Sequence, residues 1–348
     1  MKMNPGIVAA LGAATLFGLS TPIAKTLVGE TSPLLLSGLL YVGSGLGLGI
    51  LLTVRAIGLG RASIVRPRGA DLLPLFGAIA FGGAIGPYLL MYGLRITDSA
   101  SASLILNLEG VFTALLAWYA FKENFDHRIA AGMALIVAGG VVLSAGPALR
   151  AGGLLGPLAI AGACLAWAVD NNLTRTVSIH DAMWVACVKG LIAGPISVAL
   201  ALRFGAHAPT ETLLLRAGLL GFVGYGLSLT LFVLALRNLG TARTGAYFSL
   251  APFIGAVLAV AIGAPLTPTL IIAGLFMGAG VWLHLTEDHA HSHRHSSLEH
   301  EHSHFHDSHH EHAHADWDGH EPHSHPHVHE PIEHTHAHFP DVHHRHDH

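Results

Sequence analysis

The sequence has few charged residues and only two cysteines. Charged residues make up 11% of its 348 residues, far below the share in a soluble domain, while hydrophobic residues make up 51%. The formal net charge is −4, so the strongly basic surface that nucleic-acid binding needs is missing. Cys164 and Cys187 both lie in apolar stretches. We therefore predict neither a nucleic-acid partner nor a disulfide framework.

Motifs for phosphate binding and catalysis are also missing. No Gly-rich loop ending in Lys-Ser or Lys-Thr is present, so the sequence does not support ATP-driven chemistry. It has neither a convincing nucleophile elbow nor a zinc-protease helix. No clustered acid and base residues argue for an integral-membrane enzyme. We therefore expect a protein that is not an enzyme and requires no cofactor.

Long apolar stretches dominate the chain up to about residue 286. Each is about 18 to 25 residues long, the length that crosses a bilayer as a helix. Such all-round apolar helices predict an all-α, multi-pass membrane protein whose main partner is the lipid bilayer. The ten predicted spans are Gly6–Val28, Pro33–Val54, Leu72–Arg95, Ala100–Phe121, Arg128–Ala145, Leu154–Val177, Asp181–Phe204, Thr212–Arg237, Thr241–Ile262 and Pro268–Leu285.

The chain contains one stretch twice. Leu94-Arg95 ends an apolar run before a short polar turn, and Leu236-Arg237 does the same in the second copy. The register continues through further pairs: Ala100 with Ala242, Leu108 with Leu250, and, in the first spans, Phe17 with Trp167. Two five-span repeats, residues 1–146 and 147–286, enter the membrane from opposite sides because five is odd. Inverted repeats are typical of secondary transporters, with the substrate site near the midplane.

The longest connection predicts the orientation. It follows Val54 and carries Arg55, Arg61, Arg66 and Arg68. Positive residues favour the cytoplasmic side, so this connection is predicted to be cytoplasmic. With ten spans, both termini then lie in the cytoplasm as well. The predicted location is the plasma membrane or the inner membrane of the cell. The sequence does not predict an oligomeric state.

Several polar residues interrupt the predicted spans. Ionisable groups inside a membrane are costly, and by default they mark a pathway. The predicted substrate path comprises Lys25, Asn107, Glu109, Asp170, Asn171, Asn172 and Lys189. A hairpin near His180 would bring Asp170 and Lys189 to similar depth, where they could pair. Such a pair could line the path, or it could simply neutralise two charges so that the helices insert.

The segment 287–348 has a different composition. It consists mainly of His, Asp, Glu, Ser and Pro with almost no aliphatic residues, so we predict a disordered cytoplasmic tail. Neutral imidazole is a ligand for zinc, nickel, cobalt and copper, and we expect several interchangeable divalent-metal sites. The predicted metal ligands are His289, His291, His293, His295, His300, His302, His304, His306, His323, His325, His327, His329, His334, His336 and His338.

Three short segments carry a family resemblance. They are Leu16–Pro22, Asn107–Trp118 and Phe121–Glu123. Because of these segments, the two halves resemble two EamA-type repeats of the drug/metabolite transporter superfamily. The resemblance implies ten spans, cytoplasmic termini and a central cavity between inverted halves. One position departs from the pattern, because Ala264 stands where an acidic residue matching Glu123 is expected.

Two functions compete at this point. The first is a secondary permease for a small solute, either a metabolite or a metal species, with export as the expected direction and a metal-binding tail. The second is a membrane-anchored metal-binding or sensing protein without significant flux. The substrate and the coupling ion cannot be read from the residues.

Overall fold

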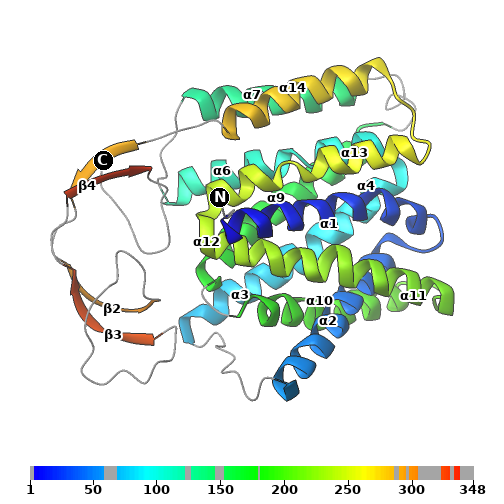
Figure 1. Ribbon diagram of the computed structural model, residues 1–348. Coiled ribbons are helices and arrows are strands. Elements are labelled where there is room, and N and C mark those ends of the chain that lie inside the picture. Colours follow the sequence, from blue (N-terminus) through cyan, green and yellow to red (C-terminus); the bar gives the residue numbers. More distant parts are fainter. Residues whose placement is uncertain are drawn as a thin grey trace. The chain divides into compact units, whose positions relative to one another are not determined.

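The structure is a computed structural model, shown in Figure 1. It describes residues 4–58, 69–121, 127–145, 153–178 and 181–285, together with four tail segments, 290–294, 298–304, 323–329 and 333–337. Arg61, Arg66, Arg68 and Glu123 lie outside the described residues, as do the tail histidines 289, 295, 306 and 338. The chain divides into a helical unit, which includes residues 1–287, and a tail unit, Asp288–Pro340.

The helical unit consists of two successive sets of helices. The first set is α1 (Pro5–Val28), α2 (Pro33–Gly58), η1 (Gly69–Asp71), α3 (Leu72–Ala78), η2 (Ile79–Ile85), α4 (Gly86–Ile96), α5 (Ser99–Ile105), α6 (Leu108–Phe121) and α7 (His127–Ala145). The second set is α9 (Leu155–Val177), α10 (Ala182–Arg203), α11 (Glu211–Leu220), η3 (Gly221–Leu227), α12 (Ser228–Phe248), α13 (Ala251–Ala261) and α14 (Pro268–Leu285).

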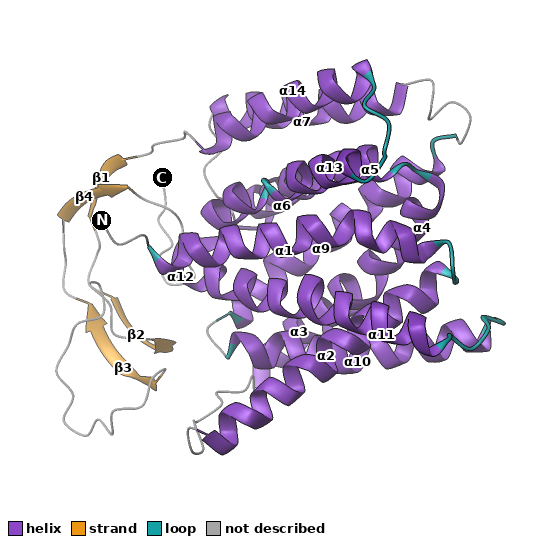
Figure 2. Cartoon of the chain, turned by 45° about the vertical axis from the view of Figure 1, so that its right-hand side comes forward, coloured by secondary structure: helices purple, strands orange, loops and turns teal. Residues whose placement is uncertain are grey.

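The helices pair across the two halves. Helix α1 packs on α12, α2 on α10, and α4 on α9. Helices α7 and α14 lie side by side at one edge, as both Figure 1 and Figure 2 show. Glycines let α2 and α10 approach closely, since a Cβ on Gly190 would lie 2.5 Å from the backbone nitrogen of Gly45. The packed interface therefore depends on small residues from both halves.

Seven helices in the described residues are long and apolar enough to cross a membrane, which confirms a multi-pass membrane protein. The apolar parts of α7 and α14 are shorter, Ala130–Leu143 and Pro268–Leu283. Helix α9 has 23 residues but carries Asp170, Asn171 and Asn172 in its C-terminal half, which lowers its hydropathy. The total of ten spans therefore remains a prediction.

Two of the predicted spans are broken, which corrects the expectation of continuous helices. The fourth span turns at Leu106-Asn107, where both backbone N–H groups bond to carbonyls three residues back and the Asn107 side chain donates to the Leu104 carbonyl. The ninth span turns at Ser249-Leu250, just before α13, whose second residue is Pro252. In the register that matches Leu94 with Leu236, the two breaks fall within one residue of each other.

The third span of each half is also irregular. Residues Ile79–Ile85 and Gly221–Leu227 are wound as π-helix inside otherwise α-helical segments. Their first residues, Ile79 and Gly221, are separated by the same offset as Leu94 and Leu236. Short π-helical stretches occur often at functional sites. The repeat thus places one such stretch in each half.

The described tail segments are extended, whereas a tail without regular structure was expected. Strand β1 (Ala290–Arg294) pairs antiparallel with β4 (Glu333–Ala337), and β2 (Leu298–His304) pairs antiparallel with β3 (His323–His329). Pairing gives the backbone groups hydrogen-bond partners without needing an apolar core, which explains how this composition can form strands. The disorder predicted for the tail as a whole stays a prediction.

Candidate functional site

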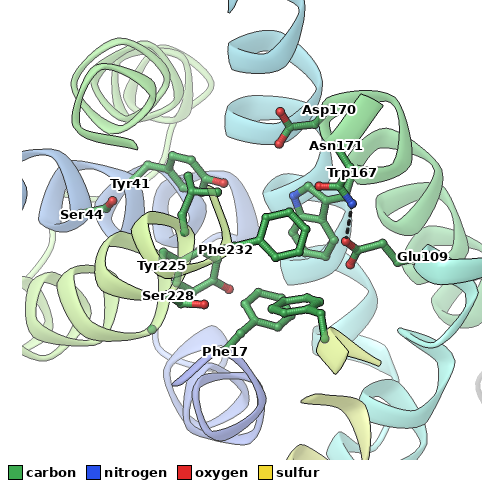
Figure 3. A pocket seen from close by; sticks show the side chains of 13 residues that line it. Phe17, Tyr41, Ser44, Glu109, Trp167, Asp170, Asn171, Tyr225, Ser228 and Phe232 are labelled. Carbon is green, nitrogen blue, oxygen red and sulfur yellow. Dashed lines mark hydrogen bonds between the residues drawn. The ribbon is translucent and has the colours of Figure 1, made fainter. Parts of the chain in front are cut away.

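A cavity lies between the two halves of the helical unit. Its volume is about 60 Å³, enough for more than one water molecule. Phe17, Tyr41, Ser44 and Glu109 line it from the first half, and the remaining lining residues come from α9, η3 and α12. Figure 3 shows these side chains gathered around one space. This position agrees with the site that an inverted repeat predicts.

Aromatic rings form much of the cavity wall. The Phe17 ring contacts those of Trp167, Tyr225 and Phe248 at centroid distances of 5.6, 5.8 and 5.6 Å. The Tyr41 ring lies 5.8 Å from Tyr225, and further along α12 the Phe232 ring lies 4.9 Å from Phe248. Edge-to-face pairs of this kind hold one another in fixed orientations. The wall is therefore a set of mutually braced rings supplied by five elements, α1, α2, α9, η3 and α12.

Two acidic side chains line the cavity, and one of them is already neutralised. Both carboxylate oxygens of Asp170 lie near the Lys189 Nζ atom, at 2.6 and 2.7 Å. Lys189 is fully buried, Asp170 is 5% exposed, and Thr174 donates a further hydrogen bond to Asp170. The predicted ion pair is thus confirmed. It joins α9 to α10 and leaves both charges almost completely buried.

Glu109 is the second acidic residue, and its surroundings differ. It lies in the first turn of α6, directly after the break at Asn107. The Asn171 side-chain amide donates to its Oε1 atom at 2.8 Å, as the dashed line in Figure 3 shows. No basic side chain is among the thirteen lining residues. Glu109 is therefore the one lining carboxylate for which the described residues provide no cation.

The structure brings only some of the predicted path residues together. Glu109, Asp170 and Asn171 line the cavity, and Lys189 supports it through Asp170. Asn107 and Asn172 are buried behind the wall, where the Asn172 amide donates to the Thr113 and Ala168 carbonyls.

Lys25 lies elsewhere. Its Nζ atom donates to the carbonyls of Leu94, Arg95 and Thr97 at the end of α4. A cation is stabilised there by the negative end of the helix dipole. The contacts of Lys25 thus fit a structural role at the end of α4 rather than a place in the cavity.

One backbone carbonyl organises the polar part of the wall. The Gly82 carbonyl, in η2, accepts hydrogen bonds from the Tyr41 hydroxyl at 2.5 Å and from the Trp167 indole N–H at 3.2 Å. Its helical donors are unavailable, because the Gly86 N–H bonds to Phe81 and Pro87 has no N–H. The π-helix and the proline therefore leave an acceptor free to fix two lining rings.

Sequence reasoning missed most of this wall. Tyr41, Ser44, Tyr225, Ser228 and Phe232 carry no motif, and each reads as an ordinary residue of an apolar helix. The match of Phe17 with Trp167 between the repeats was the available signal. These two residues contact each other in the cavity wall, as residues related by an inverted repeat can near its axis.

The described tail histidines do not form a preformed metal site. Within the residues that the structure describes, no three His, Cys, Asp or Glu side chains are grouped as metal ligands would be. The strand register nevertheless pairs histidines across each sheet: His291 with His336, His293 with His334, His300 with His327, His302 with His325 and His304 with His323.

Comparison with known proteins agrees with the architecture. The profile of the EamA-like transporter family matches residues 4–145 and again residues 154–286. An uncharacterized transporter of Methanothermobacter thermautotrophicus is 27% identical over 298 residues, covering 81% of this chain and 87% of that protein. One crystal structure, at 20% identity, covers 81% of this chain and 96% of its own with a TM-score of 0.62, which shows a shared fold.

Proposed function

Because the chain belongs to the EamA-like transporter family, we propose that it is a secondary permease that moves a small solute by alternating access through the cavity between its halves. The observation that carries this proposal is the cavity itself, which both repeats line and which holds an acidic residue without a basic partner. A site at the interface of two inverted repeats is reached from either side when the halves rock against each other.

The irregular helices support the same mechanism. Breaks before α6 and α13, and π-helical segments η2 and η3, adjoin the cavity in both halves. Interrupted backbone is tolerated at membrane depth where it lines a cavity or is buried in protein. Such segments can change conformation at lower cost than regular helix, so they are suited to relative movement of the halves.

The orientation belongs to the proposal as well. Ten spans with both termini in the cytoplasm would place Ile57, at the end of α2, inside and Glu30, before α2, outside. Single cysteines at these exposed positions, in a protein without Cys164 and Cys187, test this with an impermeant thiol reagent. Glu30→Cys should be labelled in intact cells and Ile57→Cys only after lysis. The reverse pattern would invert the orientation, and with it the expected export.

The test of transport does not require the substrate to be known. Full-length protein is reconstituted into liposomes loaded with a mixture of cell metabolites, and the solutes that leave are identified by mass spectrometry. One solute or a few should leave faster than from liposomes without protein. No selective loss would favour the alternative, a membrane-anchored metal-binding protein without flux.

The tail is proposed to bind divalent metal in the cytoplasm. Support comes from its alternating histidines and from the strand register, which pairs five histidines with five others. Alternate residues of a strand share a face, so neighbouring pairs could offer imidazoles together. Cells with full-length protein or with a version ending at Leu285 are compared for metal tolerance and for zinc, nickel and cobalt content. If the two kinds of cell have equal tolerance and equal content for all three metals, the tail has no role in cellular metal handling.

A further inference from the structure

The Gly82 carbonyl is an unusual acceptor for a residue inside a helix. In an ordinary α-helix it would accept the backbone N–H of Gly86. Here the Gly86 N–H bonds to the Phe81 carbonyl instead, in the longer register of a π-helix. The next donor in that register would be residue 87, but Pro87 has no N–H. Both backbone donors are thus removed, one by the helix register and the other by the residue type.

Two cavity side chains take the place of these donors. The Tyr41 hydroxyl donates to the Gly82 carbonyl at 2.5 Å, and the Trp167 indole N–H donates to it at 3.2 Å. A carbonyl oxygen has two lone pairs, so these two bonds occupy both. A further N–H from the backbone could bond only by displacing one of them. The bond from Trp167 is the longer and therefore the weaker of the two.

Gly86 leaves room for the indole. A Cβ atom added at Gly86 would lie 2.8 Å from the Trp167 Nε1 atom and 3.0 Å from its Cδ1 atom. A side chain at this position would therefore push the indole away from the Gly82 carbonyl. Pro87 keeps the acceptor free, and Gly86 keeps it within reach of Trp167.

The free carbonyl closes a loop of contacts around the cavity. Four rings follow one another in this loop, with centroid distances of 5.8, 5.8 and 5.6 Å between neighbours: Tyr41, Tyr225, Phe17 and Trp167 (Figure 3). The Gly82 carbonyl joins the last ring to the first. The rings belong to α2, η3, α1 and α9, so a single backbone atom fixes side chains that come from both halves.

The second half does not repeat this arrangement. Leu229 stands at the position equivalent to Pro87 and has a backbone N–H, and Ser228 stands in place of Gly86. The repeat architecture therefore requires neither the proline nor the glycine. Their presence beside the carbonyl that holds two lining rings points to a role at the cavity.

We propose that Pro87 and Gly86 are positioning residues for the solute site, which hold the Trp167 indole in one orientation so that the solute meets a fixed ring face. Neither residue lines the cavity, and both act through the Gly82 carbonyl. The consequence for solute affinity rests on the proposed transport function, whereas the consequence for the indole does not.

The indole N–H reports on its own hydrogen bond. Full-length protein in lipid nanodiscs, isotopically labelled at the indole nitrogens, is studied by NMR, and Trp167→Phe identifies the Trp167 signal among the five tryptophans. Pro87→Ala supplies a competing N–H and should speed deuterium exchange of this indole roughly 2- to 10-fold, the worth of one hydrogen bond. Gly86→Ala should speed it as well. Pro195→Ala, at an exposed position of α10 away from the cavity, should not change it.

A rescue separates competition for the carbonyl from a general loss of packing. Tyr41→Phe removes one of the two side-chain donors, so in the double variant Pro87→Ala with Tyr41→Phe the carbonyl can accept the new N–H and the indole together. Slow exchange of the Trp167 N–H should return, although this variant carries more changes than Pro87→Ala alone. Alanine is favourable in helices, so Pro87→Ala should fold, and thermal unfolding checks this.

Transport provides the second readout. In the liposome efflux assay, the solute concentration that gives the half-maximal rate should rise roughly 2- to 10-fold for Pro87→Ala. The maximal rate should change less than about 2-fold, because a fixed ring face contributes to binding throughout the cycle.

The readouts fail separately. Unchanged indole exchange in Pro87→Ala, or no recovery in the double variant, would overturn the inference. Faster exchange with an unchanged half-maximal concentration would overturn it too, because the fixed ring would then not serve the solute. If no solute leaves the liposomes selectively, the proposed transport fails, while the exchange rates still decide whether Pro87 and Gly86 position the indole.

Discussion

The two halves of the helical unit share a backbone plan but differ in their charges. Each has a π-helical segment at the same repeat position of its third span and a broken fourth span, with the two breaks within one residue of each other in the repeat register. Gly82 of η2 packs against Asp170, while its counterpart Gly224 of η3 packs against Ser20, which is the repeat equivalent of Asp170. One half of this pseudo-symmetric contact is charged and the other is neutral.

Glu109, the second acidic residue of the cavity, likewise has an uncharged counterpart in the other half. Glu109 is the second residue of α6, and the equivalent position of the other half is occupied by Ala251, the first residue of α13. The repeat therefore determines the architecture and the cavity, while a few unmatched residues make the cavity chemically one-sided. The two similar halves can rock about such a site, and a ligand then meets the same charged residues whichever side of the membrane it enters from. The predictions below test how far the unmatched residues, rather than the shared ones, carry stability and transport.

Removing Lys189 should have the largest effect. Lys189→Ala leaves the 5%-exposed Asp170 without its cation, which costs about 3–5 kcal/mol for a buried pair. The protein should be lost from the membrane or unfold at markedly lower temperature, as measured by size-exclusion chromatography and thermal unfolding in detergent.

The double variant Asp170→Asn with Lys189→Met makes this part of the second half as uncharged as the first. It should recover most of the stability, because neither charge then remains buried alone. We expect transport to stay impaired. A double variant that is folded and fully active would assign the pair to insertion and stability alone.

The next largest effects are expected from alanine at the two equivalent glycines, Gly82 and Gly224, which should destabilise the protein to different extents. A Cβ at Gly82 would lie 1.8 Å from the Asp170 Oδ2 atom, and at Gly224 it would lie 2.4 Å from the Ser20 Cβ atom. Overpacking typically costs about 1–3 kcal/mol. Gly82→Ala should cost more, since it also displaces the ion pair.

A second substitution that relieves the clash provides the control for this comparison. Ser20→Gly should relieve the clash of Gly224→Ala, because it removes the Cβ atom in the way. No similar change relieves Gly82→Ala without breaking the pair with Lys189. Equal losses in unfolding temperature for the two alanine variants would show that the charge adds nothing to the packing at Gly82.

Smaller changes in stability are expected from removing the hydroxyl groups of the two cavity tyrosines, Tyr41 and Tyr225. Tyr41 donates to the Gly82 carbonyl, whereas the Tyr225 hydroxyl has no partner in the described residues. Tyr41→Phe should therefore cost about 0.5–1.5 kcal/mol, the net worth of a hydrogen bond, with Trp167 still donating to the same carbonyl. Tyr225→Phe should leave the free protein as stable or slightly more stable. A large loss for Tyr225→Phe would reveal a partner outside the described residues.

Sequence patterns predicted the class of protein, the repeat and the pair of Asp170 with Lys189. They did so because apolar length, internal register and charges within apolar runs are local features of the chain. The breaks in the fourth and ninth spans were not predicted, since Asn107 and Pro252 disturb helices whose apolar runs continue past them. The aromatic wall was missed for another reason: its residues are brought together only by helix packing, and aromatic residues are unremarkable in membrane helices.

The smallest effect is expected at the surface contact between the halves. The Arg216 guanidinium lies 2.8 Å from a Glu30 carboxylate oxygen, but both side chains are largely exposed, at 47% and 41%. Exposed ion pairs contribute about 0–1 kcal/mol and weaken further with salt. Arg216→Ala should therefore hardly change the unfolding temperature or transport, in contrast to Lys189→Ala. If transport by Arg216→Ala nevertheless changes while stability does not, the pair acts in the movement of the halves rather than in holding them together.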